Sequence, residues 1–245
     1  MPPMTSSSPP STPPRPLANG STPYAVPVFD VPMLLAANLA GWPGSGGVCP
    51  TLTGMSIIHK TTLTPSKLDL LTAWLPGQPW YLGAGRPPAL TKVGGFRLDD
   101  PAGEVGIEFM VVCDDASGAA VFYLVPMTYR GEPLSGADDA LIGTAEHGVL
   151  GRRWVYDGVR DPVLVAQLVA CIQGDAVPQA QSISDTPDPT VSVITAPGSP
   201  GRLNVRVTRV LEPGETGVEG HPCLFAPWRL PDGSHVRGVF VSALA

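Results

Sequence analysis

A helical period of apolar residues appears between residues 64 and 75. One face of the predicted helix consists of Leu68, Leu71, Trp74 and Leu75. Thr64 suits the N-cap of this helix, and Pro65 suits its first turn. The pair Pro76-Gly77 predicts its end.

Three segments with the pattern of β-strands follow the first helix. They are LTKVGGFRL (90–98), VGIEFMVVC (105–113) and AAVFYLVPMTYR (119–130). The short loop DDASG joins the second segment to the third at hairpin length. In the third segment every second residue from Val121 to Met127 is apolar or aromatic, which is typical of a half-buried strand.

The next region is predicted to contain a short helical turn, a loop and a strand across residues 152–156. A second helix begins at Asp161 and Pro162, because Asp suits the cap and Pro the first helical position. Its buried stripe is Leu164, Leu168 and Ile172. Gly174 predicts its end.

The C-terminal part of the chain changes to a β-strand pattern. Residues 176–190 form a polar, Pro-containing linker, and residues 191–245 are predicted to be rich in strands. Within 202–211, apolar residues alternate with Arg202, Asn204 and Arg206. A hairpin is expected around Pro231-Asp232-Gly233.

Residues 1–54 differ from the rest in having almost no charge and many Pro, Ser, Thr and Gly residues. Such a segment buries too little apolar surface to offset its ordering entropy, so we expect it to be disordered. Regular patterning begins abruptly at Met55. We therefore hypothesise that Met55 is the biological start.

Charge and composition exclude several function classes. The net charge is −6 and the lysines are scattered, which argues against nucleic-acid binding. No apolar run is long enough to span a membrane, and no basic segment precedes an apolar run as in a secretory signal, so we expect a cytoplasmic protein. The four cysteines form no CxxC motif and are expected to be buried thiols.

Acid–base candidates are few. Glu146 and His147 are adjacent, but neighbouring residues point apart and no GxSxG motif accompanies them, so an exposed loop or a structural histidine is the favoured interpretation. Glu104 and Glu108 share a strand face by parity, but one strand cannot complete a metal shell. Asp114 falls in a hairpin loop, where a solvated side chain is expected.

The glycine-rich segments have one favoured interpretation, whereas the aromatic residues have two possible roles. GAGR and KVGG lack the spacing of a phosphate loop and are interpreted as turns. Aromatic side chains either fill the core or stack on a sugar. The residues concerned are Trp80, Tyr81, Trp154, Tyr156 and Trp228.

The segment LDLLTAWLPGQPWYLGAGR resembles the opening of the N-terminal cap domain of actinobacterial maltokinases. The resemblance extends over roughly residues 63–175, and stand-alone cap-like proteins fit better than the kinases. It depends on Leu75, Gln78, Trp80, Tyr81, Gly85, Arg86, Trp154, Tyr156 and Asp157.

The resemblance implies an α+β fold, with a curved antiparallel sheet packed on one or two helices as in cystatin-like caps. We place this cap at residues 55–175, before the linker and a C-terminal β-rich extension. Trp80 and Tyr81 would then close the helix against the sheet, and Arg86 would bind a carbonyl or a carboxylate.

In the kinases, two further lobes carry ATP and catalysis. None of the four histidines here begins the His-x-Asp pattern of a phosphotransferase loop, and the tail is expected to be too short for kinase lobes. We therefore expect no catalytic residue, cofactor or metal. Residues that could face a ligand or partner are Trp80, Tyr81, Arg86, Glu146, His147, Arg152 and Trp154.

Three functions remain open. The first is an accessory module of maltose, trehalose or glycogen metabolism that binds a kinase, another glucan-pathway enzyme or an α-glucan. The second is a component or relic of a maltokinase-type ATP-dependent sugar kinase. The third is an oligomerising structural or regulatory protein, whose tail would expose Arg202, Arg206 and Arg209 at a strand edge.

Overall fold

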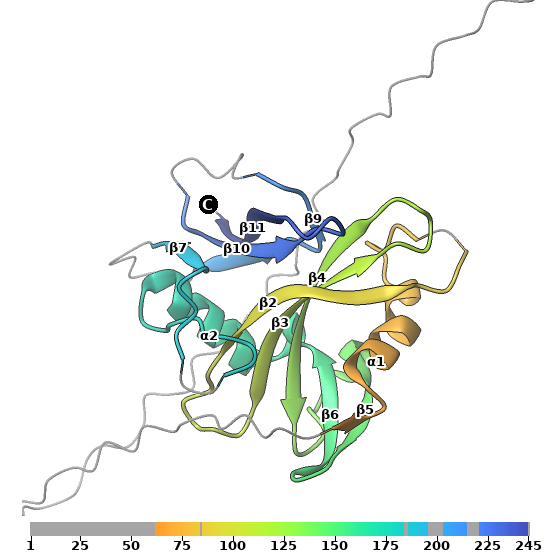
Figure 1. The fold of residues 1–245 in the computed structure, drawn as a ribbon. Helices are drawn as coiled ribbons and strands as arrows, with labels where there is room; N and C mark the ends of the chain where they lie inside the picture. The colour runs from red at the N-terminus through yellow and green to blue at the C-terminus, as the bar shows by residue number, and fades with distance from the viewer. Residues whose placement is uncertain (1–61, 84, 184–185, 196–202, 215–220, 245) are drawn as a thin grey trace, which may run out of the picture.

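A computed structural model describes residues 62–83, 85–183, 186–195, 203–214 and 221–244 (Figure 1). The interpretations of residues 1–54, of Met55 as a start and of Arg202 lie outside these residues. Among the described residues, no helix has the length and apolar character needed to cross a membrane.

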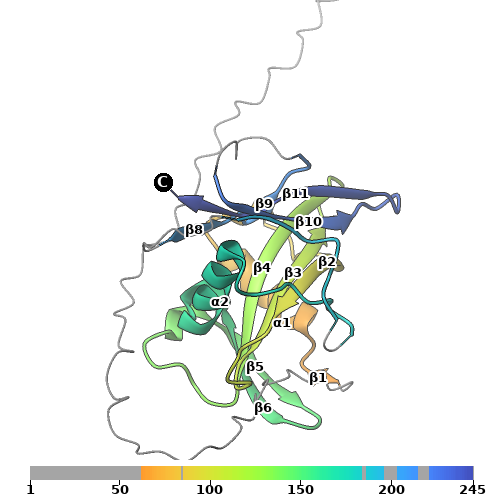
Figure 2. The ribbon, with the colours of Figure 1, turned by 90° about the vertical axis from the view of Figure 1, so that its left-hand side faces the viewer.

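A curved antiparallel sheet dominates the described part of the chain, with one α-helix on each side of its central strands (Figures 1 and 2). The helices are α1 (Lys67–Trp74) and α2 (Pro162–Gln173). The main path of strands runs β1-β5-β6-β4-β3-β2-β10-β11-β8, while β7 pairs with β10 and β9 with β4. The predicted α+β class with a β-rich C-terminal part is therefore confirmed.

The strand bounds follow the sequence pattern closely in the centre of the sheet. The strands are β1 (Leu63–Thr64), β2 (Leu90–Leu98), β3 (Gly106–Asp114), β4 (Val121–Arg130), β5 (Leu141–His147), β6 (Gly151–Asp157), β7 (Ser192–Ile194), β8 (Asn204–Val207), β9 (Val210–Leu211), β10 (Cys223–Arg229) and β11 (His235–Leu244). Short 3-10 turns occupy Leu75–Gly77, Asp138–Ala140 and Gly158–Arg160.

Helix α1 begins later than the sequence pattern indicated. Its N-cap is Ser66, whose hydroxyl accepts from the backbone of Asp69 while the Asp69 carboxylate accepts from the backbone of Ser66. This reciprocal capping box satisfies two backbone groups at the helix start, so the assignment of the cap to Thr64 was wrong. The cap of α2 at Asp161 and its end at Gly174 are confirmed.

The region between Leu141 and His147 is a strand and not the predicted loop. A register shift between Leu141 and Gly143 interrupts its pairing with β6, which weakens the two-residue period in the sequence. The strand forms a hairpin with β6 at one end of the sheet, where β1 also pairs (Figures 1 and 2).

Two hydrophobic cores lie on the two sides of the central strands. The α2-side core joins α2 to β2, β3 and the C-terminal strands, and it contains Phe96, Phe109, Leu168, Trp228 and Phe240. The α1-side core lies under α1 and contains Leu71, Leu75, Trp80, Met110 and Tyr123. Because β3 and β4 supply side chains to both cores, both faces of these strands are buried.

The C-terminal strands are built into the same sheet as the preceding ones. Strand β10 meets β2 at the pair Trp228 and Gly94. A Cβ atom at Gly94 would lie 3.0 Å from the Pro227 carbonyl and from the Trp228 Cβ, so a side chain at this position would crowd the contact. Gln179, in the segment interpreted as a linker, exchanges two backbone hydrogen bonds with Arg97 of β2.

Candidate ligand-binding site

The residues selected from the sequence fall into two groups at opposite ends of the sheet. Trp80, Tyr81 and Arg86 lie in the segment between α1 and β2. The other four, Glu146, His147, Arg152 and Trp154, lie on the β5–β6 hairpin. Figures 1 and 2 show this hairpin at the end of the sheet away from the β3–β4 loop.

The hairpin group makes surface and turn contacts. Glu146 pairs with Arg152 across the strands at 3.4 Å, and both side chains are more than half exposed. The Arg152 guanidinium lies over the Trp154 ring at 5.9 Å. The His147 Nδ1 accepts from the backbone amides of Val149 and Leu150, so this histidine stabilises the turn.

Trp80 is a core residue, because only 6% of it is exposed. Its ring contacts Trp74 at 5.8 Å and Tyr123 at 6.0 Å. The Arg209 guanidinium lies 5.0 Å from the same ring and binds both Asp157 carboxylate oxygens at 2.8 and 2.6 Å. The predicted exposure of Arg209 was therefore wrong. This arginine connects the C-terminal part of the chain to Asp157 at the end of β6.

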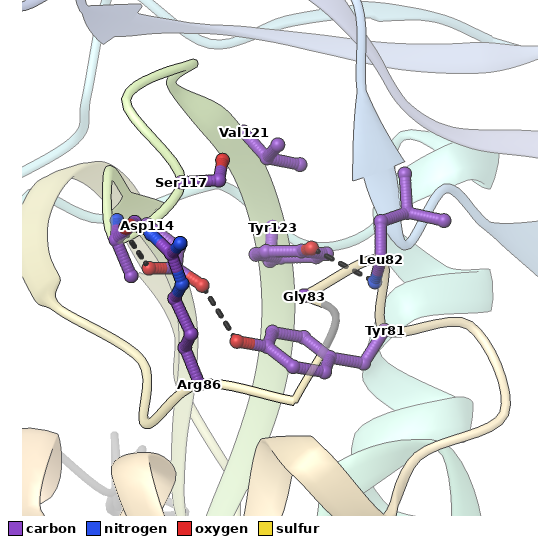
Figure 3. Close-up of a pocket in the computed structure, with 9 residues that line it drawn as sticks. Tyr81, Leu82, Gly83, Arg86, Asp114, Ser117, Val121 and Tyr123 are labelled. Atoms are coloured by element: carbon purple, nitrogen blue, oxygen red, sulfur yellow. Dashed lines mark hydrogen bonds between the residues drawn. The ribbon is translucent and has the colours of Figure 1, made fainter.

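A cavity of about 290 Å³ lies beside Tyr81, between the segment after α1 and the β3–β4 hairpin (Figure 3). Its wall consists of Tyr81, Leu82, Gly83, Arg86, Asp114, Ala116, Ser117, Val121 and Tyr123. Apolar and polar side chains thus share the wall. We refer to this cavity as the Tyr81 pocket.

Asp114 is the buried polar centre of the Tyr81 pocket. Its Oδ2 accepts from the Tyr81 hydroxyl at 2.7 Å, and its Oδ1 accepts from the amides of Ala89 and Ala116 at 3.0 and 3.1 Å. Only 5% of Asp114 is exposed, so the expectation of a solvated hairpin aspartate was wrong. Partial burial and the neighbouring Asp114 carboxylate raise the pKa of Tyr81, which keeps the phenol protonated as a donor.

The segment after Tyr81 is held against the sheet by polar contacts. The Tyr123 hydroxyl accepts from the Leu82 amide at 3.0 Å. Arg86 donates to the Ala116 carbonyl at 3.4 Å, which is the first of the two alternatives, a carbonyl or a carboxylate, that the sequence left open. Gly83 leaves room for the Tyr81 ring, because a Cβ atom there would lie 2.1 Å from the Tyr81 hydroxyl oxygen.

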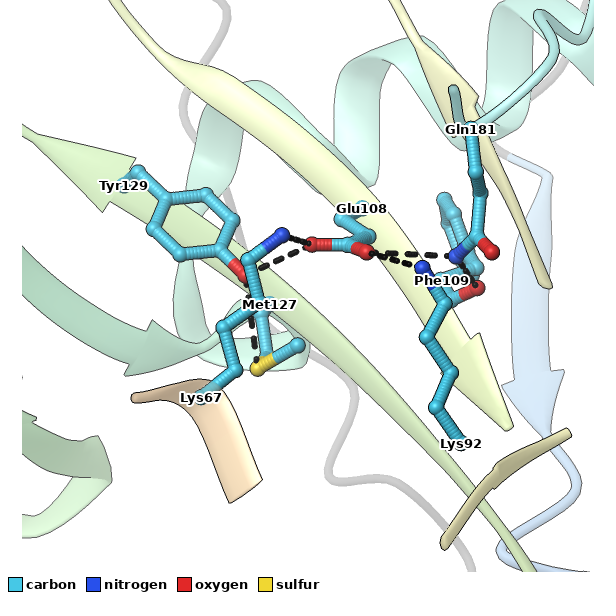
Figure 4. A network of polar contacts seen from close by, with 7 residues as sticks. All are labelled: Lys67, Lys92, Glu108, Phe109, Met127, Tyr129 and Gln181. Atoms are coloured by element: carbon cyan, nitrogen blue, oxygen red, sulfur yellow. Dashed lines mark hydrogen bonds and ion pairs between the residues drawn. The ribbon is translucent and has the colours of Figure 1, made fainter. Parts of the chain in front are cut away.

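A second buried carboxylate, Glu108, forms a polar network on β3 (Figure 4). Its Oε2 accepts from Lys67 and, at 2.7 Å, from the Tyr129 hydroxyl. Its Oε1 accepts from Lys92 at 3.5 Å and from the Gln181 amide at 3.2 Å. We refer to these five residues as the Glu108 network.

In the Glu108 network, the charge of the carboxylate is balanced by lysines of the same chain. Burial raises the pKa of Glu108, but the charges of Lys67 and Lys92 and the hydrogen bonds outweigh it, so the pKa is lowered overall. The carboxylate is therefore ionised and paired at neutral pH. Because its partners come from α1, β2, β4 and the segment after α2, it connects four parts of the chain.

The cysteines in the described part of the chain lie in the interior. Cys113, Cys171 and Cys223 are buried thiols, as the sequence predicted, and burial raises the pKa of Cys171 to about 11. In the part of the chain that the structure describes, no group of three His, Cys, Asp or Glu side chains is arranged to hold a metal ion.

Comparison with known proteins supports the resemblance seen in the sequence. A search of curated proteins found no match. The family model of the maltokinase N-terminal cap domain matches residues 74–161, a little over a third of the chain. This range contains the whole wall of the Tyr81 pocket. Residues 74–161 are therefore similar to the N-terminal cap domain of maltokinases, which confirms the resemblance of this segment to that family.

Proposed function

We propose that the chain is a maltokinase-related accessory module of maltose, trehalose or glycogen metabolism. It acts by contact, either with an α-glucan or with an enzyme of that metabolism. The match of residues 74–161 to the maltokinase N-terminal cap domain carries this proposal.

The described side chains favour binding over reaction within this segment. The Glu108 carboxylate is saturated by the chain's own donors, and the Glu146–His147 pair is used in a surface ion pair and a turn. The Tyr81 pocket combines aromatic rings, a guanidinium and a buried carboxylate, a combination that suits a polar organic ligand. We therefore favour an α-glucan over a protein as the ligand of this module.

The test is a binding experiment with the full chain. Soluble glycogen and maltoheptaose are titrated by calorimetry, and tagged chain expressed in its native host is purified and its partners identified by mass spectrometry. We expect glucan binding, or co-purification of an enzyme that makes or consumes an α-glucan. Absence of both results would refute the proposal.

A kinase assay separates this proposal from an enzymatic alternative. The purified chain is incubated with ATP, magnesium and either maltose or glucosamine. We expect no sugar phosphate above the background of a boiled sample. Turnover that scales with the amount of chain would assign a kinase activity and contradict action by contact.

A further inference from the structure

The size of the Tyr81 pocket limits its ligand. Its volume of about 290 Å³ is just below the range for small-molecule sites, which begins at roughly 300 Å³. A cavity of this size accommodates a single small ring. A longer chain would have to continue outside the pocket.

The charges of the wall favour a neutral ligand. Arg86 contributes a positive charge, and the buried Asp114 contributes a carboxylate. A bare anion bound beside Arg86 would face the Asp114 carboxylate, and a cation beside Asp114 would face Arg86. Both hydroxyls of Tyr81 and Tyr123 are neutral, since their pKa values are raised by burial.

The wall also offers both donors and acceptors. The Arg86 guanidinium makes one long hydrogen bond to a carbonyl, so most of its donors remain for a ligand in the described structure. The Ser117 hydroxyl donates to the Ala119 carbonyl, which leaves its oxygen as an acceptor. Tyr123 accepts from Leu82 and is fully buried, so it shapes the wall without offering a donor to a ligand. A ligand with several hydroxyl groups matches this mixture.

Two aromatic rings complete the wall. The Tyr81 and Tyr123 rings are 5.4 Å apart with an interplanar angle of 39° (Figure 3). Because Tyr123 is fully buried, it supports the Tyr81 ring, which is the partly exposed aromatic surface of the wall. The electron-rich face of an aromatic ring attracts C–H groups, and the flat C–H face of a sugar ring presents such groups.

We propose that the Tyr81 pocket binds one neutral pyranose ring, the terminal glucose unit of an α-glucan. This inference rests on the proposed function and adds its site and the size of its ligand. Arg86 and Ser117 bind hydroxyl groups of the ring, the partly exposed Tyr81 ring contacts its C–H face, and the rest of the glucan extends into solvent.

The first experiment is an NMR titration of the isotope-labelled full chain, which detects millimolar binding. Glucose, maltose and maltoheptaose are added, with glucuronate as the anionic and glucosamine as the cationic comparison. We expect the amides of Leu82 and Ala116 to shift, because both donate to polar groups of the wall. The three neutral sugars should bind within about threefold of one another, because each places one ring in the pocket, and both charged sugars should bind more weakly.

Two variants test the pocket by independent routes. Arg86→Gln removes a charged donor, for which we expect about a tenfold loss of affinity. Gly83→Ala displaces the Tyr81 ring and should abolish binding. Arg229→Gln is the matched control, because it removes the same charge from an exposed arginine on β10, and it should bind like the original chain. Thermal unfolding of each variant reports on folding.

The outcomes separate this inference from the proposed function. If glycogen binds but neither Arg86→Gln nor Gly83→Ala weakens it, the pocket assignment is wrong and the accessory function stands. Tighter binding of glucuronate than of glucose would also overturn the assignment, since the site would then be an anion site at Arg86. If no sugar binds while an α-glucan enzyme co-purifies, only the pocket assignment fails. Failure of both assays removes both proposals.

Discussion

Glu108 and Asp114 are two buried carboxylates on the same strand with different surroundings. Both are about 5% exposed or less, and each accepts from a tyrosine hydroxyl at 2.7 Å. Because Asp114 lies six positions after Glu108 along β3, an even offset, both point to the α1 side of the sheet, Glu108 near the start of the strand and Asp114 at its end. They differ in the other groups that donate hydrogen bonds to each carboxylate.

The two carboxylates differ in whether lysine side chains pair with them. Lys67 and Lys92 both pair with Glu108, so the positive charge of the Glu108 network is used inside the protein. Asp114 is instead satisfied by a phenol and two backbone amides, and the nearby Arg86 contacts a carbonyl. The comparison indicates that Glu108 stabilises the fold, whereas Asp114 shapes a pocket whose cation remains accessible.

The largest effect is expected for Trp80→Ala, because Trp80 packs on Tyr123 in the wall of the pocket and lies in the α1-side core. Truncating a buried Trp costs about 3–5 kcal/mol of unfolding free energy. The variant should also lose sugar binding, whereas the Glu108 network should persist. Urea unfolding measures the free energy, and unchanged stability would contradict the core role of Trp80.

Glu108→Gln should cause the next largest loss of unfolding free energy. Breaking a buried ion pair costs about 3–5 kcal/mol, but the side chains of Lys67 and Lys92 are 34% and 38% exposed and can turn to solvent. We therefore expect a loss of about 2–3 kcal/mol with sugar binding retained.

The matched control for Glu108→Gln is Glu146→Gln. It makes the same change in a surface pair whose side chains are 64% and 61% exposed, and it should stay within about 0.5 kcal/mol of the original chain. Equal losses in the two variants would contradict the central role of Glu108.

Low pH should reproduce part of the Glu108→Gln effect. The pKa of Glu108 is lowered in the folded state from an ordinary value of 4.5, so its contribution is complete above that value and is lost as the pH falls through the lower, folded-state pKa. The stability difference between the original chain and Glu108→Gln should therefore shrink at pH 3. Urea unfolding of both at pH 7 and pH 3 measures it, and a constant difference would show that Glu108 carries no pH-dependent stability.

The sequence predicts the central strands well because their alternation and turns are local signals. Strands β2, β3 and β4, the tail hairpin and the stripe of α2 all match the predicted segments. Strand β5 was missed because a bulge at Leu141 and Gly143 breaks its two-residue period. The start of α1 was misplaced because the reciprocal contact of Ser66 and Asp69 outweighs the single cap signal at Thr64.

The candidate site was predictable only in part. Tyr81 and Arg86 were selected from the resemblance, and both line the pocket. Asp114 was missed because one of its donors is Tyr81, 33 residues earlier, and the Glu108 network was missed because its partners lie between 16 and 73 residues away. Such contacts depend on strand register, which no local pattern specifies.

The smallest effects are expected from removing the tyrosine hydroxyl that donates to each of the two carboxylates. Tyr129→Phe removes a donor from Glu108, and a hydrogen bond to a charged group contributes about 1.5–3 kcal/mol, so we expect a loss near the lower end. Tyr81→Phe should cost less, about 0.5–1.5 kcal/mol, because water in the pocket can replace the donor to Asp114. Sugar binding should weaken only in Tyr81→Phe. Denaturant unfolding and the NMR titration measure the two quantities, and a larger stability loss in Tyr81→Phe than in Tyr129→Phe would invalidate the distinction between an internally saturated network and an accessible pocket.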